Sequence, residues 1–308
     1  MSERSEKPLT WAERKSRIQR CRWKTPFQYA EWLCEWVAYG LSRWAFVDVL
    51  DYAGRFTILV TVVAFFVNAA QEAANRQQEL VRQTEQQRKT KHYQAWQMLN
   101  SAAGKPGNAG RNQALSDLYA DGVSFERIDL EGAVLNGIRL DTNGPVDFQY
   151  ANLSAAQFGD ARLTRANFRM ADLSLAVLST ASCARADFEK ANLDHARLDG
   201  TDLMGANFKS ARLTNATLAG ARLDGANLTH ARLAHANLTG AILTNANLTS
   251  ACLSNAVFRN ADLRGANLSS VDNWKQIKSM KDANIRGVRH PPKDFIEWAK
   301  DKGAIDKP

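Results

Sequence analysis

Large apolar residues recur at every fifth position through much of the C-terminal half of the chain. From Phe148 to Leu268 there are twenty-five such positions, and all but Cys183 are Leu or Phe. Two residues earlier stands Ala in twenty-three of the twenty-five cases, the exceptions being Val146 and Thr201. An α-helix would scatter residues five apart around its axis, and a straight strand would alternate their faces. The chain must therefore turn once per pentad, with Ala and Leu or Phe pointing inward.

These pentads resemble a known repeat. Ala-Asn-Leu-Thr-Gly at 236–240, Ala-Arg-Leu-Asp-Gly at 221–225 and Ala-Asp-Leu-Arg-Gly at 261–265 are similar to those of the pentapeptide-repeat family. The resemblance covers 146–270 without a gap, and earlier pentads are centred on Phe125, Leu130, Leu135 and Leu140. It implies a mainly β fold, a right-handed quadrilateral parallel β-helix with four pentads per coil.

Four pentads per coil place residues twenty apart above one another. The resulting inward column is the predicted solenoid core, formed by Phe148, Phe168, Phe188, Phe208, Leu228, Leu248 and Leu268. The preceding residues form an outward column, in which amide side chains can hydrogen-bond along the stack. This predicted Asx ladder consists of Asp147, Asn167, Asp187, Asn207, Asn227, Asn247 and Asn267. Three residues in excess of the repeat, 143–145, predict a corner loop.

An uncharged segment between Arg55 and Glu72 has a dense apolar centre. Extended to 52–72, it reaches the roughly 20 residues that a membrane-spanning helix needs. The apolar run starts too far from the N-terminus for a signal peptide. The alternative is a buried core helix or strand of a soluble N-terminal domain. The predicted membrane-anchor residues are Ile58, Leu59, Val60, Val62, Val63, Phe65, Phe66 and Val67.

Aromatic residues crowd the stretch before this segment and favour the membrane interpretation. They alternate with basic residues, as in amphipathic helices that lie at a membrane interface. The predicted interface aromatics are Trp32, Trp36 and Trp44.

The chain is accordingly divided into seven parts. After the span, the residues are mainly Gln, Glu, Arg and Ala, without Gly or Pro, which predicts a polar helix. The expected parts are a basic tail (1–26), an amphipathic Trp-rich interfacial helix (27–51), a transmembrane helix (52–72), a polar connector helix (73–100), a linker with N-terminal cap (101–122), the β-helix (123–270) and a C-terminal cap with a short helix (271–308).

Charge is distributed unevenly along the chain. The formal net charge is +8, and residues 1–24 hold eight Lys and Arg against three Glu. Residues 146–270 hold twelve Lys and Arg against ten Asp and Glu. Some soluble members of the resembled family mimic DNA and bind topoisomerase, which requires a strongly acidic rod. A nearly neutral solenoid argues against that role, and the basic tail beside a span fits anionic lipid better than nucleic acid.

The residue types of common catalytic and metal sites do not converge in the sequence. Cys21, Cys34, Cys183 and Cys252 form no C-x-x-C pair, and His195, His230 and His235 take outward positions without a paired carboxylate. No phosphate loop or nucleophile motif is present. We therefore expect free thiols, no enzyme activity, no metal and no cofactor.

Together these features predict a membrane-tethered, non-catalytic interaction or scaffold protein whose solenoid is a protein-binding surface. The expected partners are the lipid bilayer and an unidentified protein, self-association remains open, and nucleic acid is not expected. The alternative is a membrane effector in stress or phage defence, acting by bilayer perturbation or by oligomerisation through the solenoid. We expect a single-pass protein of a bacterial inner membrane. Unpaired cysteines favour the cytoplasmic side for the solenoid.

Overall fold

The computed structural model describes residues 35, 37, 52–101 and 110–307. Its elements are helix α3 (Tyr52–Ser101), helix α4 (Arg111–Ala120), the 3-10 helix η2 (Trp274–Gln276) and helix α5 (Phe295–Asp301). The chain divides into two compact units, Met1–Thr90 and Lys91–Pro308. The predicted basic tail and the interface aromatics Trp32, Trp36 and Trp44 lie outside the described residues.

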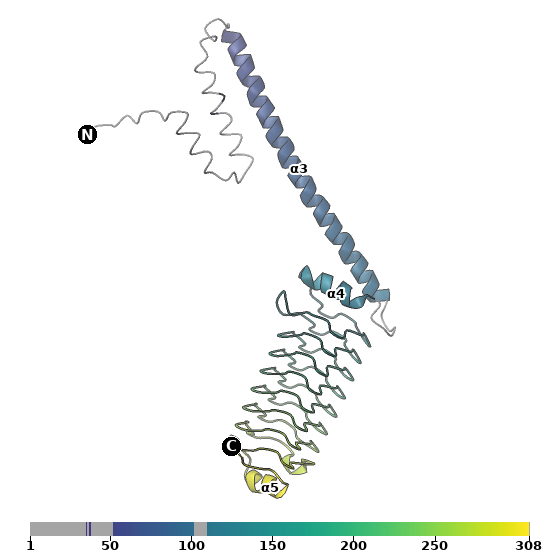
Figure 1. The fold of residues 1–308 in the computed structure, drawn as a ribbon, viewed down its shortest axis with the longest axis vertical. Coiled ribbons are helices and arrows are strands. Elements are labelled where there is room, and N and C mark those ends of the chain that lie inside the picture. Colours follow the sequence, from purple (N-terminus) through teal and green to yellow (C-terminus); the bar gives the residue numbers. More distant parts are fainter. Residues whose placement is uncertain (1–34, 36, 38–51, 102–109, 308) are drawn as a thin grey trace, which may run out of the picture. The chain divides into compact units, whose positions relative to one another are not determined.

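Stacked coils fill the second unit between α4 at one end and α5 at the other (Figure 1). Parallel bridges join residues one coil apart, and four consecutive bridges make a coil: Asp147↔Asn167, Asn152↔Asp172, Gln157↔Val177 and Arg162↔Ser182. The four bridged columns define four sides of the solenoid, which we number side 1 to side 4 in that order. A corner of two residues separates each side from the next.

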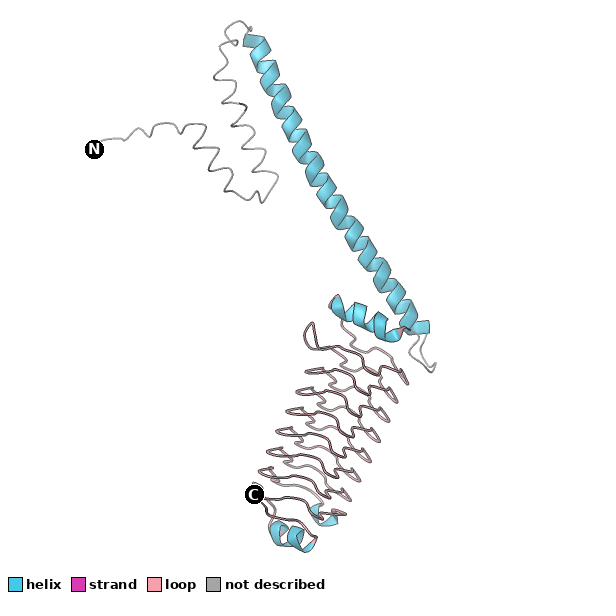
Figure 2. Ribbon diagram, viewed as in Figure 1, coloured by secondary structure: helices cyan, strands magenta, loops and turns pink. Residues whose placement is uncertain are grey.

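The coils are held by single bridges, and no strand is assigned among the described residues (Figure 2). The mainly β class expected from the sequence is thus realised without strands. Each pentad spends two residues on a corner, so only one outward residue per side can pair in register. The residues on either side of the bridged residue also bond to the neighbouring coil. Phe148 N–H donates to Asn167 O at 2.8 Å, and Asn167 N–H donates to Val146 O at 2.8 Å.

Insertions change the coil length near both ends. Across residues 143–145 the bridged residues are 23 apart, as in Asp129↔Asn152. Tyr119 holds this loop, because its hydroxyl donates to Gly144 O at 2.6 Å and accepts from Asn143 N–H at 2.8 Å. At the other end the bridges continue past residue 270, through Val257↔Ser279 to Asn284↔Ile305.

Helices cover both ends of the coil stack. At the N-terminal end Leu115 and Leu118 of α4 are buried together with Ala95 and Leu99 from the last turns of α3. At the C-terminal end Phe295 of α5 is buried, and its ring centroid lies 5.6 Å from that of Trp274. Both caps cover apolar side chains that a solenoid of repeats leaves open at its ends.

Most corners place a non-glycine residue in the left-handed region, where an L side chain costs roughly 1–2 kcal/mol. Ala155 is an exposed example with φ of 55°. We expect Ala155→Gly to stabilise the solenoid by about 1 kcal/mol or less, since glycine relieves the corner but loses more backbone entropy on folding. The urea midpoint of the full chain measures it. Ala151→Gly, at a buried inward position, should lower the midpoint, and a lower midpoint for Ala155→Gly would contradict the argument.

Candidate functional site

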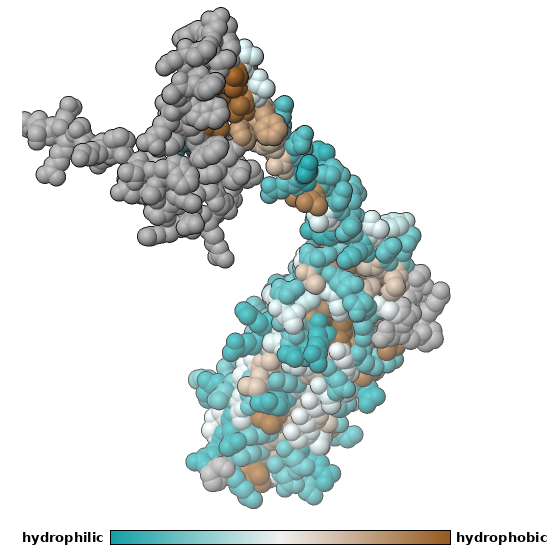
Figure 3. Space-filling model, turned by 45° about the horizontal axis from the view of Figure 1, so that its top comes forward, coloured by the Kyte–Doolittle hydropathy of each residue, from teal (hydrophilic) through white to brown (hydrophobic). Residues whose placement is uncertain are grey.

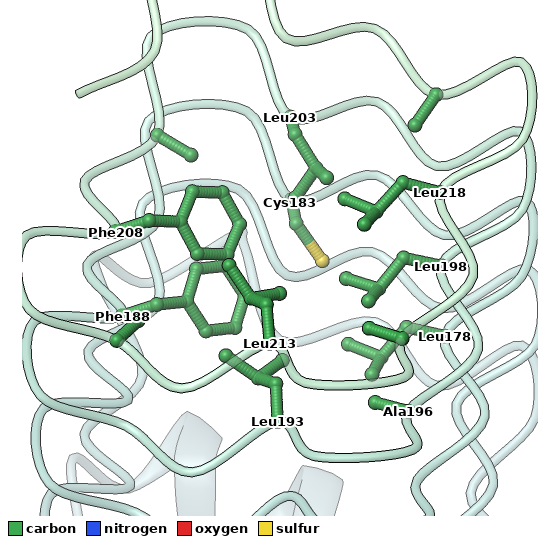
Figure 4. Packing of buried hydrophobic residues seen from close by; sticks show 14 of the residues in the cluster. Leu178, Cys183, Phe188, Leu193, Ala196, Leu198, Leu203, Phe208, Leu213 and Leu218 are labelled. Carbon is green, nitrogen blue, oxygen red and sulfur yellow. The ribbon is translucent and has the colours of Figure 1, made fainter. Parts of the chain in front are cut away.

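The inward column forms a continuous core in which five phenylalanine rings are stacked. Successive ring centroids along this stack are 5.5, 5.5, 4.9 and 4.8 Å apart. Its members are Phe125, Phe148, Phe168, Phe188 and Phe208, and the column continues through Leu228, Leu248 and Leu268, all buried. Figure 4 shows Phe188 and Phe208 lying face to face inside the coils. The interior is therefore filled with side chains and offers no ligand cavity along this column.

The outward column on side 1 carries a chain of side-chain hydrogen bonds. Asn227 Nδ2 donates to Asn207 Oδ1 at 3.0 Å, and Asn207 Nδ2 donates to Asp187 Oδ1 at 2.8 Å. Asn167 Nδ2 likewise donates to Asp147 Oδ1 at 2.8 Å. Such a chain holds neighbouring coils in register.

Threonines enter this chain in the last coils. Asn247 Nδ2 donates to Thr229 Oγ1 at 3.0 Å, and the Thr229 hydroxyl donates to Asn227 Oδ1 at 2.7 Å. Asn267 reaches Asn247 through Thr249 in the same way, with distances of 3.0 and 2.6 Å. Each threonine hydroxyl donates to the amide oxygen of its own coil. The amide nitrogen of the next coil therefore donates to that hydroxyl instead of to the amide oxygen.

Cys183 replaces Leu or Phe at one inward position and is fully buried. Figure 4 shows its sulfur pointing into the core among leucines such as Leu198. Burial in this apolar interior raises the pKa of the Cys183 thiol to about 12. Because the thiolate is the reactive species, this thiol is inert while the coil is closed.

We therefore expect iodoacetamide at pH 8 to leave Cys183 unlabelled in the folded chain and to label it in urea. Cys252 serves as the internal comparison, since it is only half-buried on side 2. Peptide mass spectrometry of the alkylated chain measures both sites. Labelling of Cys183 in the native chain at the rate found in urea would show that the coil opens there.

Within the part of the chain that the structure describes, the candidate chemical groups do not form a reactive site. His195 Nε2 lies 3.5 Å from Asn215 Nδ2, a neighbour in the next coil, and no carboxylate is bonded to this ring. Among the described residues no group of three or more His, Cys, Asp or Glu could hold a metal ion. The exposed surfaces of the described residues are further candidates for function.

Helix α3 carries an exposed apolar band. Its members Ile58, Leu59, Val60, Val63, Phe65 and Val67 are exposed, and Val62 and Phe66 are half-buried. An 18-residue window within Thr57–Leu99 has a mean hydropathy of 1.5 and none of it is buried, so by length and composition α3 could cross a membrane. Figure 3 shows hydrophobic side chains gathered on this part of α3, whereas the visible solenoid surface is mainly hydrophilic.

Residues 146–179, 181–220, 206–245 and 241–272 match the family model of pentapeptide repeats, in eight copies. Proteins with such repeats adopt a right-handed quadrilateral β-helix and are generally non-enzymatic.

Three solved structures of repeat proteins are similar to the chain. HetL from the cyanobacterium Nostoc sp. strain PCC 7120, involved in the regulation of heterocyst differentiation, is 26% identical over 63% of this chain and 92% of its own, with a TM-score of 0.37. Rfr23 from the cyanobacterium Cyanothece 51142 is 26% identical over 41% and 90%, with a TM-score of 0.22. Full-length QnrB1, a plasmid-mediated fluoroquinolone resistance protein, is 22% identical over 56% and 92%, with a TM-score of 0.27. No curated protein matches the sequence.

Proposed function

Because the chain is a pentapeptide-repeat protein, we propose that it is a non-catalytic scaffold which α3 tethers to a membrane and whose solenoid binds a partner protein. The observation that carries the proposal is the apolar band of α3, none of whose 18-residue window is buried. In this proposal residues 52–72 span the bilayer and 73–100 form the polar connector. We place the protein in a bacterial inner membrane with the solenoid on the cytoplasmic side.

The proposed tether follows from the free-energy cost of exposing the apolar band to water. Apolar surface in water costs about 25 cal/mol for each Å². Phe65 is 67% exposed and Val67 is 55% exposed, so this cost is unrelieved within the described residues. A lipid core would remove it, whereas the exposed ion pairs Glu72–Arg76 and Glu85–Lys89 farther along α3 require water.

The proposed binding role follows from the solenoid's construction. Its interior is fully packed, and its four sides are rigid surfaces held by parallel bridges. Rigid surfaces lose little entropy when a partner docks. The balance of charge over 146–270 is the reason for proposing a protein partner rather than imitation of nucleic acid.

Site-specific photocrosslinking in cells tests the binding role. A photoreactive amino acid at Tyr150 on the corner before side 2, or at Leu175 on the corner before side 3, should yield a discrete adduct in the membrane fraction, because both side chains are exposed. The same group at buried Ala151 is the matched control and should yield none. Absence of adducts from outward positions on all four sides would contradict a scaffold role.

A further inference from the structure

Positive charge collects in the C-terminal coils. Residues 146–215 hold eight Lys and Arg against eight Asp and Glu, whereas 256–289 hold seven against three. In the earlier coils several of the cations pair with carboxylates, such as Arg169 with Asp187 and Arg212 with Asp194. In residues 256–289, all of which the structure describes, Arg264 forms an ion pair with Asp262 and the other cations form none.

Five of these cations gather along the two edges of side 4. Arg259 and Lys281 occupy successive coils at one corner, where Asn260 N–H donates to Lys281 O at 2.9 Å. Arg264 and Arg286 occupy successive coils at the other corner, where Gly265 N–H donates to Arg286 O at 3.0 Å. Arg289 joins the second corner, since its Nε donates to Gly265 O at 2.9 Å. All five side chains are exposed, and we call them the C-terminal basic patch.

The carboxylates near the patch leave part of its charge unbalanced. Asp262 accepts from Arg264 through Nε at 2.9 Å and Nη2 at 2.7 Å. The side-chain hydrogen bond from Arg264 is the main reason that the pKa of Asp262 is lowered, so this carboxylate stays ionised and engaged with one arginine. Asp282 and Asp306, which follows Ile305, are the other nearby acids. Five cations face three carboxylates.

Apolar side chains lie at both ends of this stretch of side 4. The outward column runs Ile242, Asp262, Asn284, Ile305 through successive bridges, and both isoleucines are half-buried. Three coil steps of ~4.8 Å separate the isoleucines by ~14 Å. Residues i and i+4 of an extended segment are ~13–14 Å apart and point to the same face. The spacing therefore matches two apolar side chains of one extended segment.

We propose that this part of side 4 binds an extended acidic segment of a partner protein, with apolar residues at positions i and i+4 and acidic residues at i+1 and i+3. The apolar side chains would contact Ile242 and Ile305. Side chains at i+1 and i+3 leave an extended segment on the face away from side 4. The long arginine and lysine side chains of the two corners would therefore reach around the edges of the segment to meet the acidic groups. The inference rests on the proposed binding function and specifies the chemistry of its partner.

A nucleic acid fits this surface less well. Its phosphates would meet the Asp262 and Asp282 carboxylates between the cations, and its backbone has no apolar groups for Ile242 and Ile305. The opposite charge of an acidic protein segment also speeds and orients docking.

Fluorescence anisotropy with the full chain in detergent tests the inference at 150 mM NaCl. The probe is a fluorescein-labelled peptide, Gly-Leu-Glu-Asn-Glu-Leu-Gly, with a scrambled peptide of adjacent leucines for comparison. The test variant is Lys281→Glu with Arg286→Glu. The matched control is Arg165→Glu with Arg185→Glu, which makes the same charge change in the first coils, at the side 4 corner that Arg286 occupies in the last coils, and both arginines are exposed. Circular dichroism melting verifies that each variant is folded.

We expect the test variant and the scrambled peptide each to raise the Kd about tenfold, and the control variant to change it less than twofold. Equal losses in both variants, or none in the test variant, would overturn the inference. So would a twenty-nucleotide oligothymidine that binds the wild type more tightly than the peptide does. If cellular crosslinks persist in the Lys281→Glu, Arg286→Glu chain, this inference is wrong and the scaffold function stands. If the wild type yields no crosslinks although it binds the peptide, the scaffold function is wrong.

Discussion

Phe188→Ala should destabilise the solenoid by about 3–5 kcal/mol, the usual cost of emptying a buried aromatic site. The ring is fully buried between Phe168 and Phe208, with centroid distances of 4.9 and 4.8 Å and interplanar angles of 8° and 3°. Rigid coils cannot collapse into the space, because the bridges fix their spacing. The free energy of unfolding from urea titration of the full chain measures the loss.

Phe188→Leu is the matched control. Leucine fills the same inward position in later coils, at Leu228, Leu248 and Leu268. The control should therefore cost clearly less than the alanine variant. A loss below about 1 kcal/mol for Phe188→Ala, where emptied aromatic sites cost several times as much, would mean that the phenylalanine stack does not hold these coils together.

Val60→Arg combined with Val63→Arg should move the chain from the membrane fraction to the soluble fraction. Both valines are exposed in the apolar band of α3. An arginine near the centre of a spanning helix costs about 2.5–3.5 kcal/mol on insertion scales, so two cost about 5–7 kcal/mol. High-speed centrifugation of lysed cells, followed by immunodetection, measures the distribution.

Leu80→Arg combined with Val81→Arg is the control for this variant. These residues are 62% and 60% exposed on the same helix, beyond the proposed span. The control chain should remain with the membranes as the wild type does. Equal behaviour of the two double variants would show that charge in the apolar band is irrelevant to localisation.

The inward column shows how far periodicity alone can reach. A step of twenty residues places Phe148 to Leu268 in one column, and the structure stacks these side chains inside the coils. A step of twenty residues back from Phe148 does not reach Phe125, although Phe125 belongs to the same column. The two ring centroids lie 5.5 Å apart. The extra residues 143–145 lengthen the coil, so the step there is 23 residues. The excess of three residues is visible in the spacing from Leu140 to Phe148, but a constant step of twenty does not carry the column across it.

The outward features depended on details that spacing does not contain. The position of Thr229 and Thr249 between amides follows from hydroxyl orientation, which a repeat pattern does not determine. The C-terminal basic patch also escaped the sequence analysis. Its residues lie on both sides of the irregular region at 271–278, across which the bridge step becomes 22 residues, as in Asp262↔Asn284. Without that step, Arg264 and Arg286 cannot be assigned to one corner.

Alkaline carbonate extraction of membranes from cells that make the full chain tests the tethered scaffold most directly. The chain should remain in the membrane pellet after the wash, because an apolar helix that spans the bilayer is not released by high pH. Complete release into the supernatant would contradict the account and make the apolar part of α3 a surface that another protein covers.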